Sequence, residues 1–296
     1  MERVLVTGVS GRIGAALLPY FESQGAQIVR MVRRAPRGPD QIQWDPLKPV
    51  SAEAVSGFDA VIHLAGESIV GRWTAAKKKA MRDSRVLGTR RLSEALAQAK
   101  QRPEVFICAS AIGIYGDRGD EILTEASGAG NGFLAELARD WEKASGAAID
   151  AGIRTVNIRI GLVLSSRGGA LEKMLPPFKL GLGGRIGSGR QWWSWIHVDD
   201  IVGAMHHAIR NPSLSGPVNF TAPGAVQNTE FTGTLAAALS RPAIFPVPAF
   251  AARLAFGEMA DELLLASERV KPARLQASGY SFRFPELRPA LEDLLA

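Results

Sequence analysis

The feature that most constrains the fold is a glycine-spaced turn close to the start of the chain. A short apolar run at residues 4–6 is followed directly by Thr7-Gly8-Val9-Ser10-Gly11-Arg12-Ile13-Gly14. Apolar side chains then recur with helical spacing up to Phe21, and the pattern ends near Gly25. A strand, a tight glycine turn and a helix in this order predict the first unit of a parallel α/β sheet.

Each glycine of this turn has its own geometric task. Gly8 permits the tight turn, Gly11 lets the backbone approach a pyrophosphate, and Gly14 lets the helix pack on the sheet. The helix N-terminus adds free N–H groups and the positive end of the helix dipole. A merely tight strand-to-helix turn is the alternative, but three glycines in this register seldom serve packing alone. The turn therefore predicts a dinucleotide site built from Gly8, Ser10, Gly11, Arg12, Ile13 and Gly14.

The rest of the first half alternates strands with helices. Strand patterns cover 27–32, 60–64, 104–109 and 154–158, and helical patterns cover 74–99 and 132–151. This rhythm predicts a Rossmann-type, doubly wound parallel sheet. Beyond residue 165 the chain becomes rich in Gly and Pro, with helices near 199–210 and 230–239. We expect 1–165 to form the dinucleotide-binding domain, with 190–222 contributing to it, and 166–296 to form mainly a smaller substrate lobe.

The composition argues against several other classes of protein. The chain has 296 residues, of which 46% are hydrophobic, so it can bury a sizeable core. Its apolar runs are shorter than a signal peptide or a membrane helix requires, so we expect a cytoplasmic protein without a membrane partner. The net charge of +6 is scattered without a DNA-reading motif, and the histidines lack metal-ligand spacing. We therefore expect no nucleic acid and no metal, a small-molecule substrate, a monomer or homodimer, and a buried, unreactive Cys108.

The end of the second strand indicates which dinucleotide binds. An NAD site places Asp or Glu there to bond the ribose 2′-hydroxyl, but this chain has Arg33 and Arg34. Two guanidiniums suit a 2′-phosphate, with which they form charge-assisted hydrogen bonds. A solvated basic turn is the alternative. The pattern therefore favours NADP over NAD.

Further motifs resemble the extended short-chain dehydrogenase/reductases. They are the glycine turn, His63-Leu64-Ala65-Gly66-Glu67, Ser84-Arg85 and Trp195-Ile196-His197-Val198-Asp199-Asp200-Ile201. Within that superfamily the chain is similar to the YfcH-like epimerase-family proteins, through Trp44-Asp45-Pro46, Gly181-Leu182-Gly183-Gly184 and the tail from Gly279-Tyr280 to Phe284-Pro285-Glu286-Leu287. The resemblance covers nearly the whole chain but says little about the substrate. It implies NADP contacts from Gly8, Gly11, Ile13, Arg33, Arg34, Leu64, Ala65, Glu67, Arg85 and Val163.

The catalytic residues of that superfamily are only partly present. Its reductases use a Ser or Thr, together with a Tyr that is followed four residues later by Lys. Ser110 occupies the expected serine place, but the helix positions read Phe133 and Leu137, which exchange no proton. Tyr115 is the nearest phenol and is the candidate acid, with a packing role as the alternative.

The second half offers two candidate substrate contacts. Arg190 and Gln191 precede a group of tryptophans, and clustered tryptophans more often pack in a core than bind a ligand. The sequence as a whole predicts an NADP(H)-binding oxidoreductase or epimerase-like enzyme that acts on a small polar or sugar-like molecule. The alternative is a non-catalytic NADP(H)-binding sensor or interaction module, because the Tyr and Lys are missing.

Overall fold

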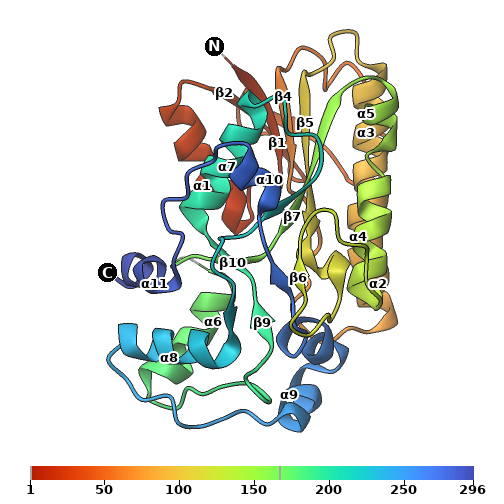
Figure 1. Ribbon diagram of the computed structural model, residues 1–296. Helices are drawn as coiled ribbons and strands as arrows, with labels where there is room; N and C mark the ends of the chain where they lie inside the picture. Colours follow the sequence, from red (N-terminus) through yellow and green to blue (C-terminus); the bar gives the residue numbers. More distant parts are fainter. Residues whose placement is uncertain (1, 167) are drawn as a thin grey trace.

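A parallel sheet of seven strands forms the centre of the computed structural model, which describes residues 2–166 and 168–296 (Figure 1). The strand order is β11-β7-β5-β4-β1-β2-β3. The strands are β1 (Arg3–Thr7), β2 (Gln27–Val32), β3 (Gln41–Gln43), β4 (Ala60–His63), β5 (Val105–Ala111), β7 (Arg154–Ile160) and β11 (Gly216–Phe220). The order reverses between β1 and β4, which places the switch point beside the glycine turn. The predicted Rossmann-type fold is confirmed.

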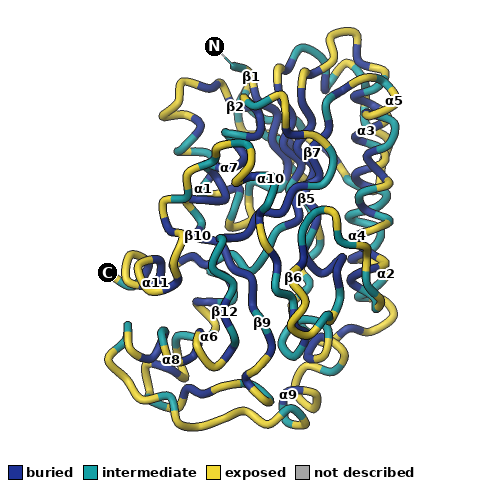
Figure 2. Tube along the Cα trace, in the orientation of Figure 1, coloured by how far each residue is buried: buried dark blue, intermediate teal, exposed yellow. Residues whose placement is uncertain are grey.

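Helices cover both faces of this sheet. α1 (Arg12–Ser23) and α7 (Val198–Arg210) pack together on one face, while α3 (Gly88–Gln98), α4 (Phe133–Lys143) and α5 (Gly146–Asp150) lie on the other. Val4 and Val6 pack in the core that contains Phe21 of α1, whereas Leu5 packs in the core that contains Leu92 of α3. Successive residues of a strand point to opposite faces, so both cores meet at β1. Figure 2 shows the strands as the buried centre of the molecule.

Several predicted elements agree with the structure, and others differ from it. The helix expected over 74–99 consists of α2 (Ala75–Arg82), a π-helical turn η1 (Asp83–Leu87) and α3. The strand β11 was not expected; it pairs with β7 in parallel and brings residues 216–220 into the central sheet. Cys108 is fully buried and free, as expected.

Many of the remaining elements form a smaller lobe beyond the carboxyl edge of the sheet (Figure 1). α6 (Gly169–Lys179), α8 (Asn228–Ala238) and α11 (Leu287–Leu295) share a core with Trp193 and Trp195. Short strand pairs accompany them: β8 (Leu162–Leu164) with β10 (Trp195–His197), β9 (Trp192–Trp193) with β12 (Val226–Gln227), and β6 (Ile122–Leu123) with β13 (Arg269–Val270). Of the other short elements, α9 (Ala249–Phe256) packs with η3 (Ala260–Leu264), whereas η2 (Ile112–Tyr115) packs against α4 and α10 (Ala273–Ala277) packs against β11.

Asp200 fastens the C-terminal tail to the sheet layer. Its carboxylate, which belongs to a residue only 1% exposed, accepts hydrogen bonds from the backbone N–H groups of Arg283 at 2.7 Å and Phe284 at 2.8 Å. The Tyr280 hydroxyl donates to the Asp200 carbonyl oxygen at 2.9 Å. The tail therefore packs as part of the fold. Within the described residues, no helix combines the length and apolar composition needed to cross a bilayer.

Candidate functional site

The glycine turn after β1 has little room for side chains at two of its glycines. Gly8 has a φ of +76°, and a Cβ atom there would lie 2.6 Å from the carbonyl carbon of Leu64. A Cβ atom on Gly14 would lie 2.6 Å from the Gly8 oxygen. At Gly11 the one near atom is the Gly8 oxygen, at 3.1 Å. Gly8 and Gly14 are therefore required by the fold, whereas the absence of a side chain at Gly11 leaves space outside the turn.

The N-terminus of α1 fits a pyrophosphate. Among the described residues no side-chain hydrogen bond caps the N-terminus of this helix, and no acidic residue lies in its first turn. Ser10, Gly11 and Arg12 are exposed there, while Ile13 packs partly against the core. Uncapped N–H groups and the positive end of the helix dipole are the groups that bind phosphate.

Two arginines follow β2 at the same edge of the sheet. Arg33 and Arg34 are both exposed, and neither guanidinium forms a hydrogen bond or ion pair with another of the described residues. The charge of Arg33 acts on Glu67, in the loop after β4. Both cations are therefore available to an anionic ligand beside the glycine turn.

Arg85 fixes the loop after β4 through a hydrogen bond to its backbone. The Arg85 Nη1 donates to the Glu67 carbonyl oxygen at 2.9 Å, and its guanidinium lies 5.0 Å from the centre of the Trp141 ring. Burial lowers the pKa of Arg85 to about 10, so it stays charged at neutral pH. The Glu67 carboxylate accepts a hydrogen bond from Lys77 at 2.7 Å, which lowers its pKa. Leu64 and Ala65, at the start of the same loop, are partly exposed.

A buried polar network lies beneath the turn. The Thr7 hydroxyl accepts from the Ala65 N–H at 3.3 Å and lies 2.7 Å from Nδ1 of His63. The other imidazole nitrogen lies 3.0 Å from the Thr89 hydroxyl, which also accepts from Trp141. Burial lowers the pKa of His63 to about 3, so the ring is neutral.

Ser110 and Tyr115 meet in a second buried network, at the end of β5. Ser110 donates to Glu142 at 2.8 Å, and the Arg159 guanidinium binds both oxygens of the same carboxylate at 2.8 and 3.0 Å. Tyr115 is 0% exposed; it donates to Asn219 at 2.7 Å and accepts from Arg159 at 2.9 Å. Burial raises the pKa of Tyr115. Of the two roles that the sequence left open for Tyr115, acid and packing residue, this burial favours the packing role.

At the two α4 positions where the superfamily's reductases carry Tyr and Lys, this chain has the apolar residues Phe133 and Leu137. Phe133 packs edge-on against Trp73, with ring centres 5.5 Å apart, and Leu137 is buried. Ala111, which follows Ser110 at the end of β5, is partly exposed. At this end of β5 the partly exposed residue is therefore Ala111, which offers only a methyl group, while the Ser110 hydroxyl points inward.

Two carboxyl groups near this point were not singled out by the sequence. Glu262 of η3 caps α4: its two oxygens accept from the backbone N–H groups of Phe133 and Leu134, each at 3.0 Å. Glu268 approaches Gly113 of η2, since its Oε1 lies 3.9 Å from where a Cβ of Gly113 would be. Burial raises the pKa of Glu268 to about 8. Both come from the segment before β13, far from β5 in sequence.

The two candidate substrate residues differ in their surroundings. Gln191 is 6% exposed, and its Nε2 donates to the carbonyl oxygens of Ile186 and Leu264, both at 3.0 Å, so it joins two loops. Arg190 is exposed. Val163 is partly exposed in β8, where it is paired with Ile196 of β10.

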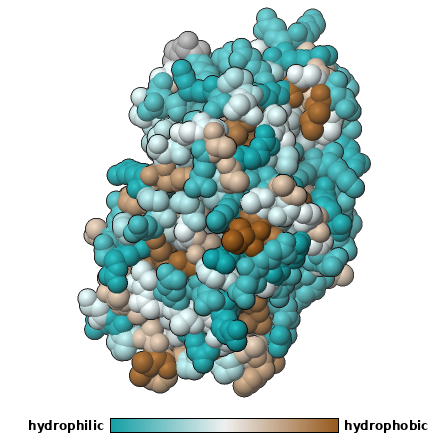
Figure 3. All heavy atoms as spheres, viewed as in Figure 1, coloured by the Kyte–Doolittle hydropathy of each residue, from teal (hydrophilic) through white to brown (hydrophobic). Residues whose placement is uncertain are grey.

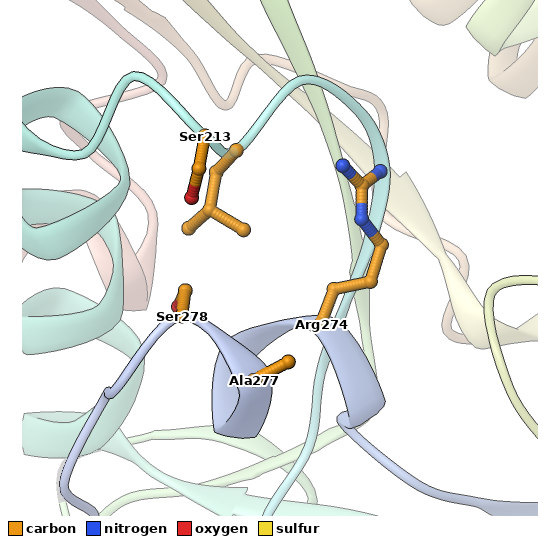
Figure 4. A pocket seen from close by; sticks show the side chains of 5 residues that line it. Ser213, Arg274, Ala277 and Ser278 are labelled. Atoms are coloured by element: carbon orange, nitrogen blue, oxygen red, sulfur yellow. The ribbon is translucent and has the colours of Figure 1, made fainter.

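Two small cavities lie away from these groups. One of about 150 Å³ is lined by Ser213, Leu214, Arg274, Ala277 and Ser278, at the amino end of β11 (Figure 4). The other, of about 390 Å³, includes Glu2, Asp59 and Arg154 at the amino edge of the sheet. Figure 3 shows a mostly hydrophilic face with scattered hydrophobic residues. Since Rossmann folds bind ligands at the carboxyl edge, neither cavity is the candidate site.

Known proteins resemble the chain over almost its whole length. Residues 4–220 match the NAD dependent epimerase/dehydratase family, and residues 247–294 match DUF1731, a domain of unknown function. The epimerase family protein Mb2239 of Mycobacterium bovis is 43% identical over 290 residues, which are 97% of this chain and 96% of the relative. The human epimerase family protein SDR39U1 is 38% identical over 298 residues, 99% of this chain and 100% of that protein.

Solved structures of epimerase-family proteins also match the fold of this chain. The crystal structure of human SDR39U1 (isoform 2) with NADPH has a TM-score of 0.92 and 36% identity, and the match covers 99% of both chains. The nucleoside-diphosphate sugar epimerase of Corynebacterium glutamicum has a TM-score of 0.83 and 40% identity; the match covers 99% of this chain but 58% of that one. With a family match over most of its length and relatives above 30% identity, the chain belongs to the NAD-dependent epimerase/dehydratase family.

Proposed function

We propose that this protein binds NADP(H) and acts as an oxidoreductase or epimerase-like enzyme on a small polar or sugar-like molecule. The observation that carries the proposal is the uncapped glycine turn beside Arg33 and Arg34, two arginines without a partner in the described part of the chain. The turn suits the pyrophosphate, and the arginines suit a 2′-phosphate. The human relative whose crystal structure holds NADPH supports the same choice of cofactor.

The other residues that we propose as cofactor contacts lie at the same edge of the sheet. Leu64, Ala65 and Glu67 follow β4, where the adenosine half of a dinucleotide passes in Rossmann folds, and Arg85 holds their loop in place. Ala111 and Val163, near the ends of β5 and β7, are our candidates to face the nicotinamide. When bound, NADPH supplies a hydride from that ring. The protein must supply orientation and a proton.

We assign Ser110 and Tyr115 positioning roles in this chemistry. Both hydroxyls are engaged by the Arg159–Glu142 ion pair, whose side chains are 9% and 15% exposed. Buried charges require such partners, because an unpaired ion loses its solvation without compensation. We infer that the two residues hold the end of β5 against α4 and β7.

A second candidate function is a non-catalytic NADP(H)-binding module. The observation that favours it is the inward placement of Ser110 and Tyr115, together with the apolar Phe133 and Leu137. A turnover screen separates the two functions: NADPH absorbance is followed in the presence of sugars, ketones, aldehydes and quinones. Substrate-dependent oxidation of NADPH supports the enzyme, and its absence across all four classes favours the module.

The cofactor assignment is tested with the double variant Arg33→Ala/Arg34→Ala. We expect NADPH binding to weaken by about 2 to 4 kcal/mol, because one or two charge-assisted contacts are lost. NADH binding, measured by the same fluorescence titration, should hardly change. Arg37→Ala is the matched control, since it removes an exposed arginine from the same loop. Equal losses for both cofactors would contradict the assignment.

A further inference from the structure

Glu268 is a titratable group at the carboxyl edge that the roles above do not use. Its backbone is fixed on both sides: the Glu268 N–H donates to the Trp192 carbonyl oxygen at 3.0 Å, and its own carbonyl oxygen accepts from Ser194 at 2.6 Å. Ser194 is itself 2% exposed. A backbone held in this way gives the side chain a defined direction, which is toward η2.

The carboxyl group lies over the residues that follow β5. Its Oε1 is 3.9 Å from the position of a Cβ on Gly113, which comes two residues after Ala111. The same Cβ would meet Leu134 of α4 at 3.2 Å, so a side chain at Gly113 would press on Leu134 and approach the carboxyl group. Taken as a whole residue, Glu268 is of intermediate exposure. It is therefore next to the edge that we assign to the nicotinamide and substrate.

The charges around Glu268 favour its protonated form. Asp117, in the loop after η2, and Glu262 of η3 are the charged groups that act on it, and both are acidic. The nearby cations are turned elsewhere: Arg269 lies over the Trp192 ring at 4.1 Å, and Arg118 pairs with Glu121 at 2.6 Å. Burial, with smaller contributions from the two carboxylates, raises the pKa of Glu268 to about 8.

Glu262, the other carboxyl group near this edge, has its oxygens engaged by the backbone. Both of its oxygens accept backbone hydrogen bonds at the start of α4, and such bonds stabilise the ionised form. Among the described residues, no hydrogen bond or ion pair to the Glu268 carboxyl group is found. Glu268 is thus a carboxyl group whose surroundings favour the protonated form and whose oxygens have no partner among the described residues.

We propose that Glu268 is the proton-exchange group of this site, giving its proton to a substrate carbonyl oxygen or taking one from a substrate hydroxyl. This role rests on the proposed function. In reduction, a hydride from NADPH adds to the carbonyl carbon, the carbon–oxygen π pair takes the proton of Glu268, and NADP⁺ and the alcohol result. Glu268 is left as the carboxylate and regains a proton from water. In oxidation the carboxylate accepts the hydroxyl proton.

The first test needs no substrate, because NADP⁺ and NADPH differ by a positive charge on the nicotinamide ring. An ionised Glu268 near that ring favours NADP⁺, so the preference for NADP⁺ over NADPH should rise with pH. We expect a change of about threefold to tenfold between about pH 6.5 and pH 9.5, with a midpoint near the Glu268 pKa. The dissociation constants of both cofactors are measured by titration calorimetry at each pH.

Glu268→Gln, which has nearly the same shape, should remove this pH dependence while both cofactors still bind. Glu268→Asp should restore it in part, and Glu262→Gln should move the midpoint to lower pH, because a like charge is removed. Glu53→Gln, which removes an exposed carboxylate from the segment before β4, is the control that should leave the curve unchanged. A melting curve for each variant verifies folding.

A pH dependence that is unchanged in Glu268→Gln, or absent from the native protein, would overturn the role of Glu268 while cofactor binding stands. Failure of the native protein to bind either cofactor would instead overturn the proposed function, and the role with it. For a carbonyl substrate found in the turnover screen, Glu268→Gln should lower the reduction rate about a hundredfold with the KM for NADPH unchanged.

Discussion

The two halves of the carboxyl edge use their polar residues in opposite ways. At the ends of β1 and β2, polar groups such as Thr7 and His63 are buried with their partners. The exposed Arg33 and Arg34 have no partner among the residues that the structure describes. At the ends of β5 and β7, Ser110 and Tyr115 have turned inward to an ion pair, and partly exposed Ala111 carries only a methyl group.

The difference teaches that the two tasks of a Rossmann enzyme are separable in this chain. The nucleotide half keeps the uncapped helix and free cations that an anionic ligand needs. In the chemical half, the hydroxyl groups expected to act on a substrate are committed to holding secondary-structure elements together. A proton donor there has to come from another segment, which is why the Glu268 carboxyl group matters.

The largest effect should come from Gly11→Val, which tests whether the nucleotide half is truly a ligand site. We expect binding of both NADPH and NADH to fall at least a hundredfold, because a branched side chain would occupy the space of the pyrophosphate. The fold should survive, since among the described residues a Cβ at Gly11 meets only the Gly8 oxygen, at 3.1 Å.

The control is Gly233→Val, on a helix position where nothing lies within 4 Å of a Cβ. It should bind both cofactors normally in the same fluorescence titration. If folded Gly11→Val binds either cofactor normally, Gly11 is a turn residue alone and the contrast between the two halves is lost.

An intermediate effect is expected from acid, through the network beneath the turn. The folded-state pKa of His63 is about 3, below the unfolded value near 6.5, so between these values the unfolded chain takes up a proton and the folded chain does not. The His63 contribution to the free energy of unfolding should be complete above about pH 6.5. Below it, stability should decline by up to about 1.4 kcal/mol per pH unit.

Urea unfolding at steps between about pH 4 and pH 7 measures this slope. The variant His63→Asn, compared with the native protein at each pH, isolates the histidine from the carboxylates that titrate in the same range. Parallel curves for the two proteins would mean that His63 is protonated in the fold and that the network is wrongly described.

The smallest effects should come from Ser110→Ala and Tyr115→Phe, which test the chemical half. Each removes one hydroxyl from the Arg159–Glu142 pair, so each should destabilise the fold by about 1 to 3 kcal/mol, through a buried group left unsatisfied. NADPH affinity should be unchanged. Turnover of any substrate found should fall far less than in Glu268→Gln, and losses of a hundredfold would make these residues the proton donors after all.

Local patterns were sufficient to predict most of the first half of the fold. The strand expected at 27–32 is β2 with the same bounds, because an apolar run between a glycine and a basic turn has few other solutions. The pattern did not reveal α6, which contains Pro176 and Pro177, residues that usually interrupt a helix. Nor did it reveal β11, whose neighbour in the sheet, β7, lies about sixty residues earlier.

The site was predictable where it consists of consecutive residues. The glycine turn and Arg33-Arg34 are local motifs, so their places followed from the sequence. The partners of Ser110 and Tyr115 did not, since Glu142 and Asn219 come from α4 and β11. One signal was available: Arg159 stands inside an apolar strand, and a buried arginine requires a partner.

The pairing of β13 with β6 fixes when this protein can finish folding. Arg269 and Val270 align with Ile122 and Leu123, and the tail that follows is tied to Asp200. Contacts between such distant residues form late, because a long loop must close first. During synthesis, most of the central sheet is therefore made before the segment that supplies Glu262 and Glu268 has left the ribosome. A nascent chain stalled before that segment would expose apolar surface that chaperones bind.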